Sequence, residues 1–600
     1  MHPFISFIKN IRIYKKEELL KSIKLLSKKQ FFAFVGSLFI ALVCLIIILS
    51  KINNHFLVEV PISGGTITEG IISTPTLINP VLAVSDADKD LTALVYSGLM
   101  RKNSDGTYLP DLAESYKVSP DQLTYTFILK KDLTFHDGSR LTADDVIFTI
   151  DKIKNPLIKS SQSSKWAGIE TEKIDDRTVV FSLKKPYPSF MDNTTIGVLS
   201  MKIWGGLTPA EFMLSGLNIK AIGSGPYLID SISKNKDGIP NIYVLKRFKH
   251  FVLGVPLIKY VKIISYANEK DLLQALVSHK IDQAGSLSPE NAQTLIKSGY
   301  QIKTAVVPRM FGLFFNENQN KVFADPAVIK AFNKALDRKD IIEKVLFGYG
   351  TIIDNPVPKT LINDRVADDL ISSAEEAGAI LDKAGWILRE SGIRAKGGTS
   401  IVTKTTKVKG KTITKTQTVS NGPLVELAFS LSTGDDPELS QVAILIKEEL
   451  EKIGARVEIK NYEIGTLNQL IRDRKFEGLF FGQMMSQESY LYDFWHSSQR
   501  NNPGLNIALY SNPIVDKLLE NLQKNSDSKD RLDEYSRFIK EFRKDLPALF
   551  IYSPEYLYAT RETLGNLSFK AITAPSDRFN SIHTWYAKTD RVWKIFITNE

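Results

Sequence analysis

The sequence predicts an α/β protein joined to a membrane by one N-terminal helix. From about Thr66 to Asp590 the apolar residues alternate between strand and helix periods, with no long linker rich in proline or serine. Before this body, residues 31–50 form an uncharged and almost wholly apolar run. The chain has 600 residues, 43% of them apolar and 24% charged, which is the composition of an ordinary folded protein and excludes collagen, a coiled-coil rod and general disorder.

The apolar run is long enough to cross a bilayer, because twenty helical residues extend about 30 Å, the thickness of the hydrocarbon core. Eight Lys and Arg residues precede it within residues 1–30, whereas only Lys51 follows closely. This asymmetry predicts that the N-terminus stays in the cytoplasm and that the body lies on the extracytoplasmic side of the cytoplasmic membrane. We therefore expect a basic cytoplasmic segment at 1–30, a single-pass transmembrane anchor at 31–50 and a spacer at 51–65.

A cleaved signal peptide and a lipoprotein anchor are the alternatives. A signal peptide has a shorter apolar region that ends in small residues, but Lys51-Ile52-Asn53-Asn54-His55 follows this run. A lipoprotein needs a small residue directly before its modified cysteine, whereas Val43 precedes Cys44. We expect Cys44, the single cysteine, to be a membrane-embedded hydrophobic residue that forms no intramolecular disulfide.

The formal charge of +10 is not spread over the body. Residues 1–30 carry +6, and residues 61–600 carry only +4. Six lysines in one segment without an acidic residue contribute +6 to the charge of residues 61–600. The rest of the body therefore carries about −2. The six lysines are Lys396, Lys404, Lys407, Lys409, Lys411 and Lys415. This distribution is not the footprint of a nucleic-acid-binding protein, so we expect no nucleic-acid partner.

One strand–helix–strand unit indicates the class of the body. Leu424–Ser430 is predicted as a strand, and Asp435-Asp436-Pro437-Glu438 supplies the cap and first turn of a helix that Gly454 ends. Residues 456–459 then alternate as a second strand. This order indicates a right-handed crossover in a mostly parallel or mixed sheet.

Residues 399–419 have a different pattern, in which Thr, Val, Ile and Lys alternate around Gly410. The alternation predicts an exposed basic β-hairpin, with a disordered basic loop as the alternative. Of two roles, contact with an acidic partner or a solvated insertion, the second is favoured because the segment has little apolar surface.

Enzyme and metal signatures are missing from the sequence. There is no His-Glu-x-x-His, and no serine has glycine at both the −2 and +2 positions. Ser182–Lys185 fits Ser-x-x-Lys but lies in a predicted strand, and Asp86–Asp90 begins like a calcium loop but continues with Leu91 where glycine is required. We read Asp86–Asp90 as an acidic helix start, and we expect no catalytic residue, no metal and no cofactor.

Several motifs, in order along about 500 residues, resemble the family 5 extracellular solute-binding proteins, the peptide- and nickel-type receptors of ATP-binding cassette importers. The motifs are Tyr96-Ser97-Gly98-Leu99, Pro110–Ser115, Tyr125-Thr126-Phe127, Phe135-His136-Asp137-Gly138, Leu141–Val146, Gly223-Ser224-Gly225-Pro226-Tyr227, Ala331–Arg338, Leu381–Trp386, Trp495-His496-Ser497-Ser498 and Asp545-Leu546-Pro547-Ala548. Read from the residues alone, most of them are scaffold. We expect His136 to be structural, and Thr142 or Ser139 to cap a helix.

The resemblance implies a two-lobed periplasmic-binding-protein-like clamshell with mixed sheets, whose lobes close on a ligand. Gln301–Val307 and Leu546–Tyr552 are the expected strands that cross between the lobes. The expected division, given as a list, is lobe I at 61–305 plus 548–600 with an inserted subdomain at about 103–220, and lobe II at 306–547 with the hairpin insertion at about 399–419.

The implied function is that of a membrane-anchored, monomeric receptor that captures a peptide-like or other small solute and delivers it to the permease and ATPase subunits of an importer. An anchored sensor or scaffold with the same clamshell is the alternative. The residues expected to line the cleft are Tyr96, Trp204, Phe314, Asn316, Met484, Gln487 and Tyr490, with Trp495 as outer support. Core packing is the competing role for Phe314, and gap filling for Met484.

One loop departs from the family pattern. Peptide-binding relatives often carry an aspartate there that pairs with the α-ammonium of the peptide, but Gly482–Tyr490 contains no aspartate. Ser486 and Gln487 offer only neutral hydrogen bonds, and Glu488 is expected to start the next turn. If the ligand is a peptide, we therefore expect little preference for a free N-terminus, and otherwise a ligand that is not a free peptide. Glu488 as a substitute for the missing aspartate is the alternative.

Overall fold

The computed structural model describes residues 26–103, 106–187, 189–359, 361–362, 365–367, 370–408, 411–420, 422–485, 489–524, 528–561 and 564–593. The chain forms two compact units. The smaller consists of Met1–Ile62 with Lys588–Glu600, and the larger of Ser63–Ala587.

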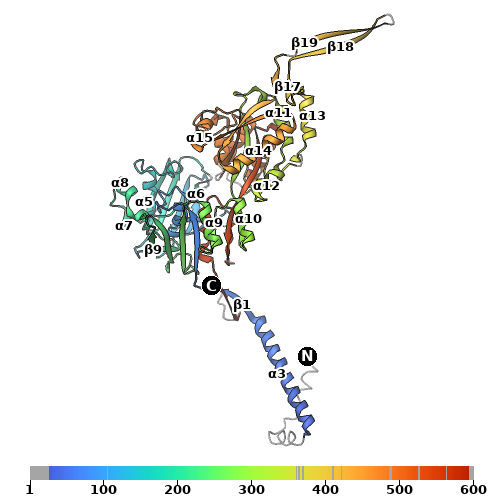
Figure 1. Ribbon diagram of the computed structural model, residues 1–600. Coiled ribbons are helices and arrows are strands. Elements are labelled where there is room, and N and C mark those ends of the chain that lie inside the picture. The colour runs from blue at the N-terminus through green and yellow to red at the C-terminus, as the bar shows by residue number, and fades with distance from the viewer. Residues whose placement is uncertain are drawn as a thin grey trace. The chain divides into compact units, whose positions relative to one another are not determined.

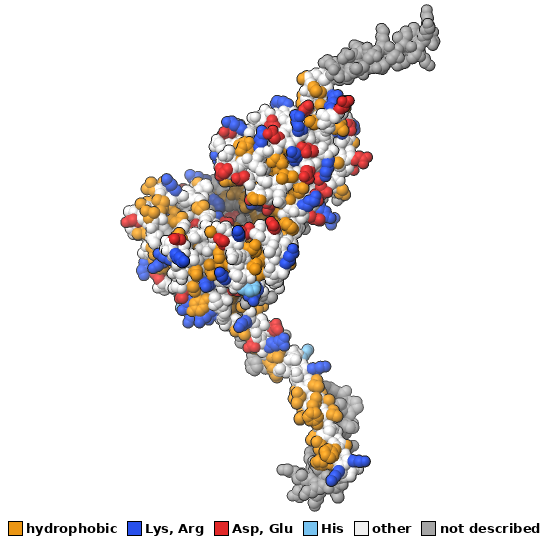
Figure 2. Space-filling view, in the orientation of Figure 1, with side chains coloured by type: hydrophobic (Ala, Val, Ile, Leu, Met, Phe, Trp, Pro, Cys, Tyr) orange, Lys and Arg blue, Asp and Glu red, His pale blue; other side chains and the backbone are white. Residues whose placement is uncertain are grey.

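The smaller unit is built on helix α3 (Lys28–Phe56), which begins at a capping box between Ser27 and Gln30. Its apolar side chains are exposed along its length, as Figure 2 shows, and within the described residues it is the one helix long and apolar enough to cross a membrane. The helix extends beyond the expected 31–50 and leads directly into strand β1 (Leu57–Pro61), which pairs antiparallel with β25 (Thr589–Trp593). The stretch expected to be a spacer is thus largely ordered, because its partner comes from the far end of the sequence.

The larger unit contains a 12-stranded mixed sheet (Figure 1) with the order β22-β21-β23-β14-β24-β12-β2-β11-β10-β9, where β13 and β15 also pair with β24. Its strands are β2 (Thr66–Ile72), β9 (Tyr227–Lys234), β10 (Pro240–Arg247), β11 (Tyr260–Tyr266), β12 (Gln283–Gly285), β13 (Gln301–Val306), β14 (Arg309–Phe315), β15 (Gly350–Ile352), β21 (Ala428–Gly434), β22 (Arg456–Tyr462), β23 (Gly478–Met484) and β24 (Ala548–Thr560).

Strand β24 connects two parts of this sheet. Its first residues pair with β14, and its last residues pair with β13 and β12. Strands β13 and β14 are themselves joined only by Val307 and Pro308. Two neighbouring segments of chain therefore run from one part of the sheet to the other. The expected segment 301–307 contains β13, whereas the expected segment 546–552 covers only the first part of β24.

A separate antiparallel sheet has the order β5-β6-β8-β7. Its strands are β5 (Ala113–Val118), β6 (Thr124–Leu129), β7 (Ile169–Asp175) and β8 (Thr178–Leu183). Phe127, Phe181 and Trp166 are fully buried on one face of it. Ser182 lies within β8 and is exposed, so the strand predicted around the Ser-x-x-Lys match is confirmed.

The predicted strand–helix–strand unit is confirmed as β21, helix α14 (Pro437–Lys452) and β22, with the two strands parallel. Asp436 caps α14 and Pro437 opens it. One boundary differs, because the expected strand at 424–430 is divided into β20 (Val425–Glu426) and β21. Leu427, which separates them, is buried and donates its backbone N–H to Arg394 O, so tertiary packing decides this break.

The predicted hairpin is present in the backbone. β18 (Thr399–Val408) and β19 (Lys411–Ser420) pair antiparallel over their full length. The turn between them lies outside the described residues.

Local predictions around the motifs are also confirmed. Helix α4 (Asp86–Val95) has an acidic first turn behind its cap Ser85, and Thr142 is the N-cap of α5 (Ala143–Lys154). His136 is structural, since its ring accepts from Gly223 N at 3.3 Å and lies 3.0 Å from Gly225 O. Burial lowers the pKa of His136 to about 4, which fits a neutral ring.

The remaining elements complete the layers around the sheets. The longer helices are α8 (Pro209–Leu214), α9 (Glu269–Val277), α10 (Pro289–Lys297), α11 (Pro326–Ala335), α12 (Arg338–Leu346), α13 (Ala374–Lys383), α15 (Ile464–Arg472), α16 (Ser489–Trp495), α17 (Pro513–Lys524) and α18 (Ser528–Asp545). The short elements are α6 (Phe190–Asn193), α7 (Met201–Trp204), β3 (Met100–Lys102), β4 (Tyr108–Pro110), β16 (Ile387–Leu388), β17 (Arg394–Lys396), η1 (Ser163–Trp166), η2 (Gly216–Asn218), η3 (Lys321–Ala324), η5 (Ser497–Gln499), η6 (Pro575–Phe579) and η7 (Ile582–Thr584).

Candidate functional site

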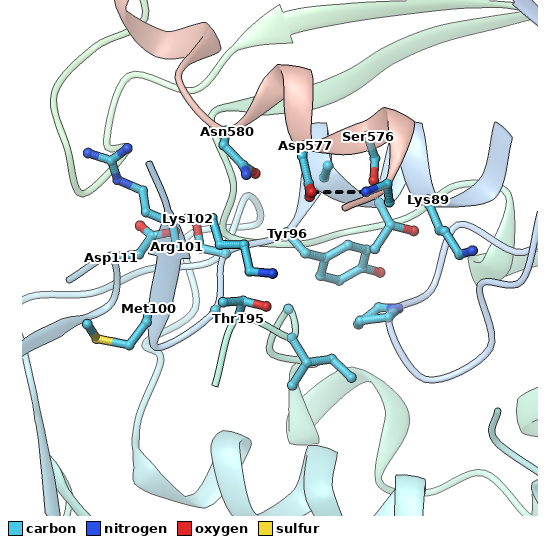
Figure 3. A pocket seen from close by; sticks show the side chains of 18 of the residues that line it. Lys89, Tyr96, Met100, Arg101, Lys102, Asp111, Thr195, Ser576, Asp577 and Asn580 are labelled. Atoms are coloured by element: carbon cyan, nitrogen blue, oxygen red, sulfur yellow. Dashed lines mark hydrogen bonds between the residues drawn. The ribbon is translucent and has the colours of Figure 1, made fainter. Parts of the chain in front are cut away.

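A cavity of about 410 Å³ lies at the C-terminal end of α4 (Figure 3). Its wall is formed by the last turn of α4, by strand β3, by the segment 192–197 and by residues 573–583. These parts lie far apart in the sequence. The cavity is therefore a product of the tertiary fold, and no local motif marks it.

Two glycines hold the end of α4 against the Gly-Ser-Gly-Pro-Tyr segment. A Cβ on Gly223 would lie 2.1 Å from Val95 O, and a Cβ on Gly225 would lie 2.6 Å from Val95 C. The N–H of Gly225 donates to Val95 O at 2.8 Å. Only residues without a side chain allow this approach, and it fixes the backbone of Tyr96 at the cavity wall.

A buried ion network supports the wall from behind. Arg578, in η6, binds Asp90 of α4 through two hydrogen bonds of 2.7 Å and binds Glu69 of β2 at 2.7 Å. Tyr558 Oη and Gln283 Nε2 donate to the second oxygen of Glu69, at 2.9 and 3.1 Å. This network ties η6 to α4, so it positions Ser576 and Asp577 in the cavity wall.

Unpartnered polar atoms gather in the cavity wall. Among the described residues, four buried side-chain atoms of residues that line the cavity lack a hydrogen-bond partner: Thr92 Oγ1, Tyr96 Oη, Arg101 Nε and Asn193 Oδ1. A buried polar group without a partner costs free energy, so such groups are rare in folded proteins. Their gathering around one cavity indicates that a polar solute or water completes their hydrogen bonds.

The cavity is lined by charged side chains of both signs, which are Lys89, Arg101, Lys102 and Lys165 together with Asp111, Asp192 and Asp577. Lys102 Nζ lies 2.5 Å from Asp192 and 3.3 Å from Thr573 Oγ1. Asp577 accepts from Thr573 N, Thr573 Oγ1 and Ala574 N, so it caps its own turn. Burial raises the pKa of Asp111 to about 6, although the charge of Arg101, a hydrogen bond with Ser97 and the charge of Lys130 oppose the shift.

A second cavity, of about 490 Å³, adjoins the first. Lys165 lines both of them. The second cavity is lined by Lys184 and Tyr187 on one side, and by Tyr490 and Asp493 of α16 on the other. Burial raises the pKa of Asp493.

The profile of the bacterial extracellular solute-binding proteins, family 5, middle, matches residues 107–502. The chain is a family 5 solute-binding protein.

Relatives over most of the chain agree with this family. The chain is 28% identical to the oligopeptide-binding protein AppA of Bacillus subtilis over 545 residues, which cover 88% of this chain and 93% of the relative. The solved structure of that protein in complex with a nonapeptide has a TM-score of 0.63 at 26% identity and is covered completely. The substrate-binding protein CtaP of Listeria monocytogenes shares the fold with a TM-score of 0.71 at 22% identity, over 88% of this chain and 99% of that chain. The family is one of non-enzymatic solute-binding proteins. The similarity to the AppA structure shows that the α/β body has the periplasmic-binding-protein fold.

The structure divides the expected cleft residues of this solute-binding protein into groups. Tyr96 lines the first cavity and Tyr490 the second. Met484, the last residue of β23, is 44% exposed, and Gln487 lies outside the described residues.

The other four expected residues are buried and line neither cavity. Trp204 contacts Phe212 with ring centroids 4.7 Å apart, and Phe314 stacks on Trp495 at 6.3 Å. Asn316 ties its turn to a distant segment, since its side-chain amide donates to Arg474 O at 2.8 Å and its side-chain carbonyl accepts from Asn318 N within the turn. These contacts are those of core and turn residues.

The cavity contains residues that the sequence reading did not select, among them Lys102, Lys165, Asp192 and Asp577. No pattern in the sequence marks them, because lysines and aspartates at these spacings are ordinary surface residues. Asp111 had a partial signal, since it belongs to the Pro110–Ser115 motif.

Proposed function

We propose that this protein is a membrane-anchored extracytoplasmic receptor, which captures a peptide-like or other small solute between two lobes and delivers it to an ATP-binding cassette importer. The observation that carries the proposal is the first cavity, with its four unpartnered buried polar atoms. Such a wall suits a polar solute better than an apolar one, because each solute contact satisfies a group that is otherwise unpaired. Names of similar proteins support the solute class, among them an oligopeptide-binding protein and the murein tripeptide-binding protein MppA.

The lobes proposed are residues 61–305 with 548–600, and residues 306–547. Their proposed hinge is formed by the β13–β14 connection and by β24, which link the two parts of the main sheet. Separate hydrophobic clusters on the two sides of these strands support the division. Hinge closure would bring α16 toward the first cavity, and only a solute with higher affinity for the closed state can drive it.

The anchor proposed is helix α3, retained in the mature protein. Its 29 residues continue without a break past the apolar run and lead into β1. Trp593 Nε1 donates to Asn53 Oδ1 at 2.8 Å, and the ring of Trp593 lies 6.2 Å from that of Phe56. Cleavage after the apolar run would cut a helix that the C-terminal strand holds in place, which favours an anchor over a signal peptide.

Receptor function is tested by native mass spectrometry of the full-length chain purified in detergent. We expect a bound solute of constant mass, which is lost in Lys102→Met and retained in the control Lys475→Met, whose side chain is 71% exposed. A chain that carries no solute, and that no peptide panel stabilises against heating, contradicts the receptor proposal.

The anchor is tested separately by N-terminal sequencing and carbonate extraction of membranes. We expect the mature chain to keep residues 31–50 and to remain in the membrane. A mature chain that begins near Asn53, or a lipid on Cys44, contradicts the anchor without touching the receptor proposal.

A further inference from the structure

Trp593 is the exposed tryptophan of this chain. All six tryptophans lie among the described residues, and the other five are at most 3% exposed, whereas Trp593 is 42% exposed. It ends strand β25 in the smaller unit and pairs with Leu57 of β1. A single exposed apolar side chain needs no explanation, but a larger exposed apolar surface indicates an interaction site.

The ring of Trp593 belongs to such a surface, an aromatic cluster at the end of α3. It lies 6.2 Å from the ring of Phe56, which is 50% exposed, and the ring of Phe56 lies 5.4 Å from that of His55. The indole Nε1 donates to Asn53 Oδ1 at 2.8 Å. The polar atom of the indole therefore has its partner within the chain, while the apolar surface of the two larger rings stays partly exposed.

The distance of this cluster from the apolar run corresponds to the edge of a bilayer. Asn53 follows Ser50, the last residue of that run, by three residues of the same helix, and Phe56 follows it by six. Because a helix rises about 1.5 Å per residue, Asn53 and Phe56 lie about 4.5 and 9 Å beyond Ser50 along the helix axis. The headgroup layer on each side of a bilayer core is about 5–8 Å thick. If residues 31–50 span the core, the aromatic cluster begins inside the headgroup layer.

Charged residues bound the cluster on both sides. In the ribbon of β1 and β25, Arg591 Nη2 lies 3.3 Å from Glu59 Oε1, and both side chains are more than half exposed. Towards the apolar run, Lys51 is the one lysine or arginine before the cluster, and a lysine at a helix end extends its amine to the headgroups. The apolar run, the aromatic cluster and the ion pair thus follow the order of bilayer core, interface and water.

We infer that Trp593 and Phe56 insert into the headgroup layer of the membrane, so that the C-terminal strand is a second membrane contact of the protein. The inference rests on the proposed anchor and goes beyond it, because it assigns a lipid partner to a strand more than 500 residues from α3 in the sequence. An interface suits an indole, whose apolar ring faces the acyl chains while its polar edge stays among polar groups. The larger unit is then joined to the membrane surface at both of its ends, Ser63 and Ala587.

The test is the tryptophan fluorescence of the full-length chain in vesicles of phosphatidylcholine and phosphatidylglycerol. One set of vesicles carries bromine near the headgroup end of the acyl chains, and the other carries it near their methyl end. Bromine quenches an indole only at close range, and we expect stronger quenching by the set brominated near the headgroups. Trp593→Phe should abolish this quenching, whereas the control Trp386→Phe, which removes a buried indole, should keep it.

Carbonate extraction and N-terminal sequencing of the same vesicles separate this inference from the anchor. A full-length chain that resists extraction, but is quenched equally in the wild type and in Trp593→Phe, overturns the inference and leaves the anchor intact. Stronger quenching by bromine near the methyl end also overturns it. A chain that begins near Asn53 contradicts the anchor, and the inference fails with it.

Discussion

Two clusters of charged residues lie at α4 and differ in how completely they are paired. Behind the helix, Arg578 faces Glu69 and Asp90, and every oxygen of these two carboxylates accepts a hydrogen bond from Arg578, Tyr558 or Gln283. In front of it, Lys102 is paired with Asp192 beside several polar atoms that have no partner among the described residues. The first cluster is complete within the chain, whereas the second is not.

The difference separates a structural role from a binding role. A buried ion network in which all groups are paired fixes the positions of its elements, but it offers nothing to a ligand. An incompletely paired cluster lowers the stability of the empty protein and gains free energy when a ligand completes it. Substitutions that remove one member should therefore destabilise the first cluster and relieve the second.

The largest effect is expected for Arg578→Met. It leaves Glu69 and Asp90 buried without their cation, which costs about 3–5 kcal/mol of unfolding free energy. Burial raises the pKa of both carboxyl groups, so the folded variant takes up protons more readily than the unfolded chain, and its stability is lost as the pH rises through the folded pKa values. In thermal unfolding, the melting temperature of Arg578→Met should fall further below that of the wild type at pH 8 than at pH 5. The control Arg140→Met, which changes a side chain that is 65% exposed, should melt like the wild type at both pH values.

Asp111→Asn is expected to raise the stability of the protein at neutral and higher pH. Burial raises the pKa of Asp111 to about 6 in the folded protein, from 3.8 in the unfolded chain. The protonated carboxyl therefore contributes its full stabilisation below pH 3.8, and this contribution is lost as the pH rises through about 6. The shift corresponds to up to about 3 kcal/mol. Melting curves from pH 4 to 8 should show the variant matching the wild type at pH 4 and exceeding it at pH 8. Parallel curves at all pH values would contradict the assignment.

Two tyrosine-to-phenylalanine substitutions, one in each cluster, compare a hydroxyl that has a partner with one that has none, and their expected effects on stability are smaller. Tyr558→Phe removes a donor from Glu69 and should cost about 1–3 kcal/mol. Tyr96→Phe removes a hydroxyl that has no partner among the described residues, so stability should stay the same or rise by about 1 kcal/mol, while solute binding weakens. Denaturant titration measures both. A loss of stability in Tyr96→Phe would show that its hydroxyl is paired within the fold.

The smallest effect is expected when a short Gly-Ser linker replaces residues 399–420. The two strands of the hairpin pair only with each other, so the body loses no strand partner. The change in unfolding free energy should be below about 1 kcal/mol, and solute binding should be unchanged. A fall of several degrees in melting temperature would mean that the hairpin contacts the body.

Local patterns predicted those elements whose causes are local. The caps at Thr142 and Asp436 depend on side chains within three residues of the helix start, and the hairpin register depends on alternation within about twenty residues. The sequence did not predict a strand at the end of the expected spacer, because β1 forms by pairing with β25, whose residues lie more than 500 positions away in the chain.

The site followed the same rule. Tyr96 belongs to a family motif and lines the first cavity, whereas Trp204 and Phe314, also expected in the cleft, lie in the core. Side-chain type alone does not distinguish a wall of a cavity from a core, since both are lined by aromatic residues.

The sequence by itself determined the apolar span, the α/β class, the family motifs and the starts of helices. Each of these depends on the period or spacing of neighbouring residues. Only the tertiary structure decided which charges line the first cavity, because Lys102, Lys165, Asp192 and Asp577 come together from segments that are up to several hundred residues apart. Charge pairing is a property of distance in space and of burial, and neither is encoded in the local pattern of the chain.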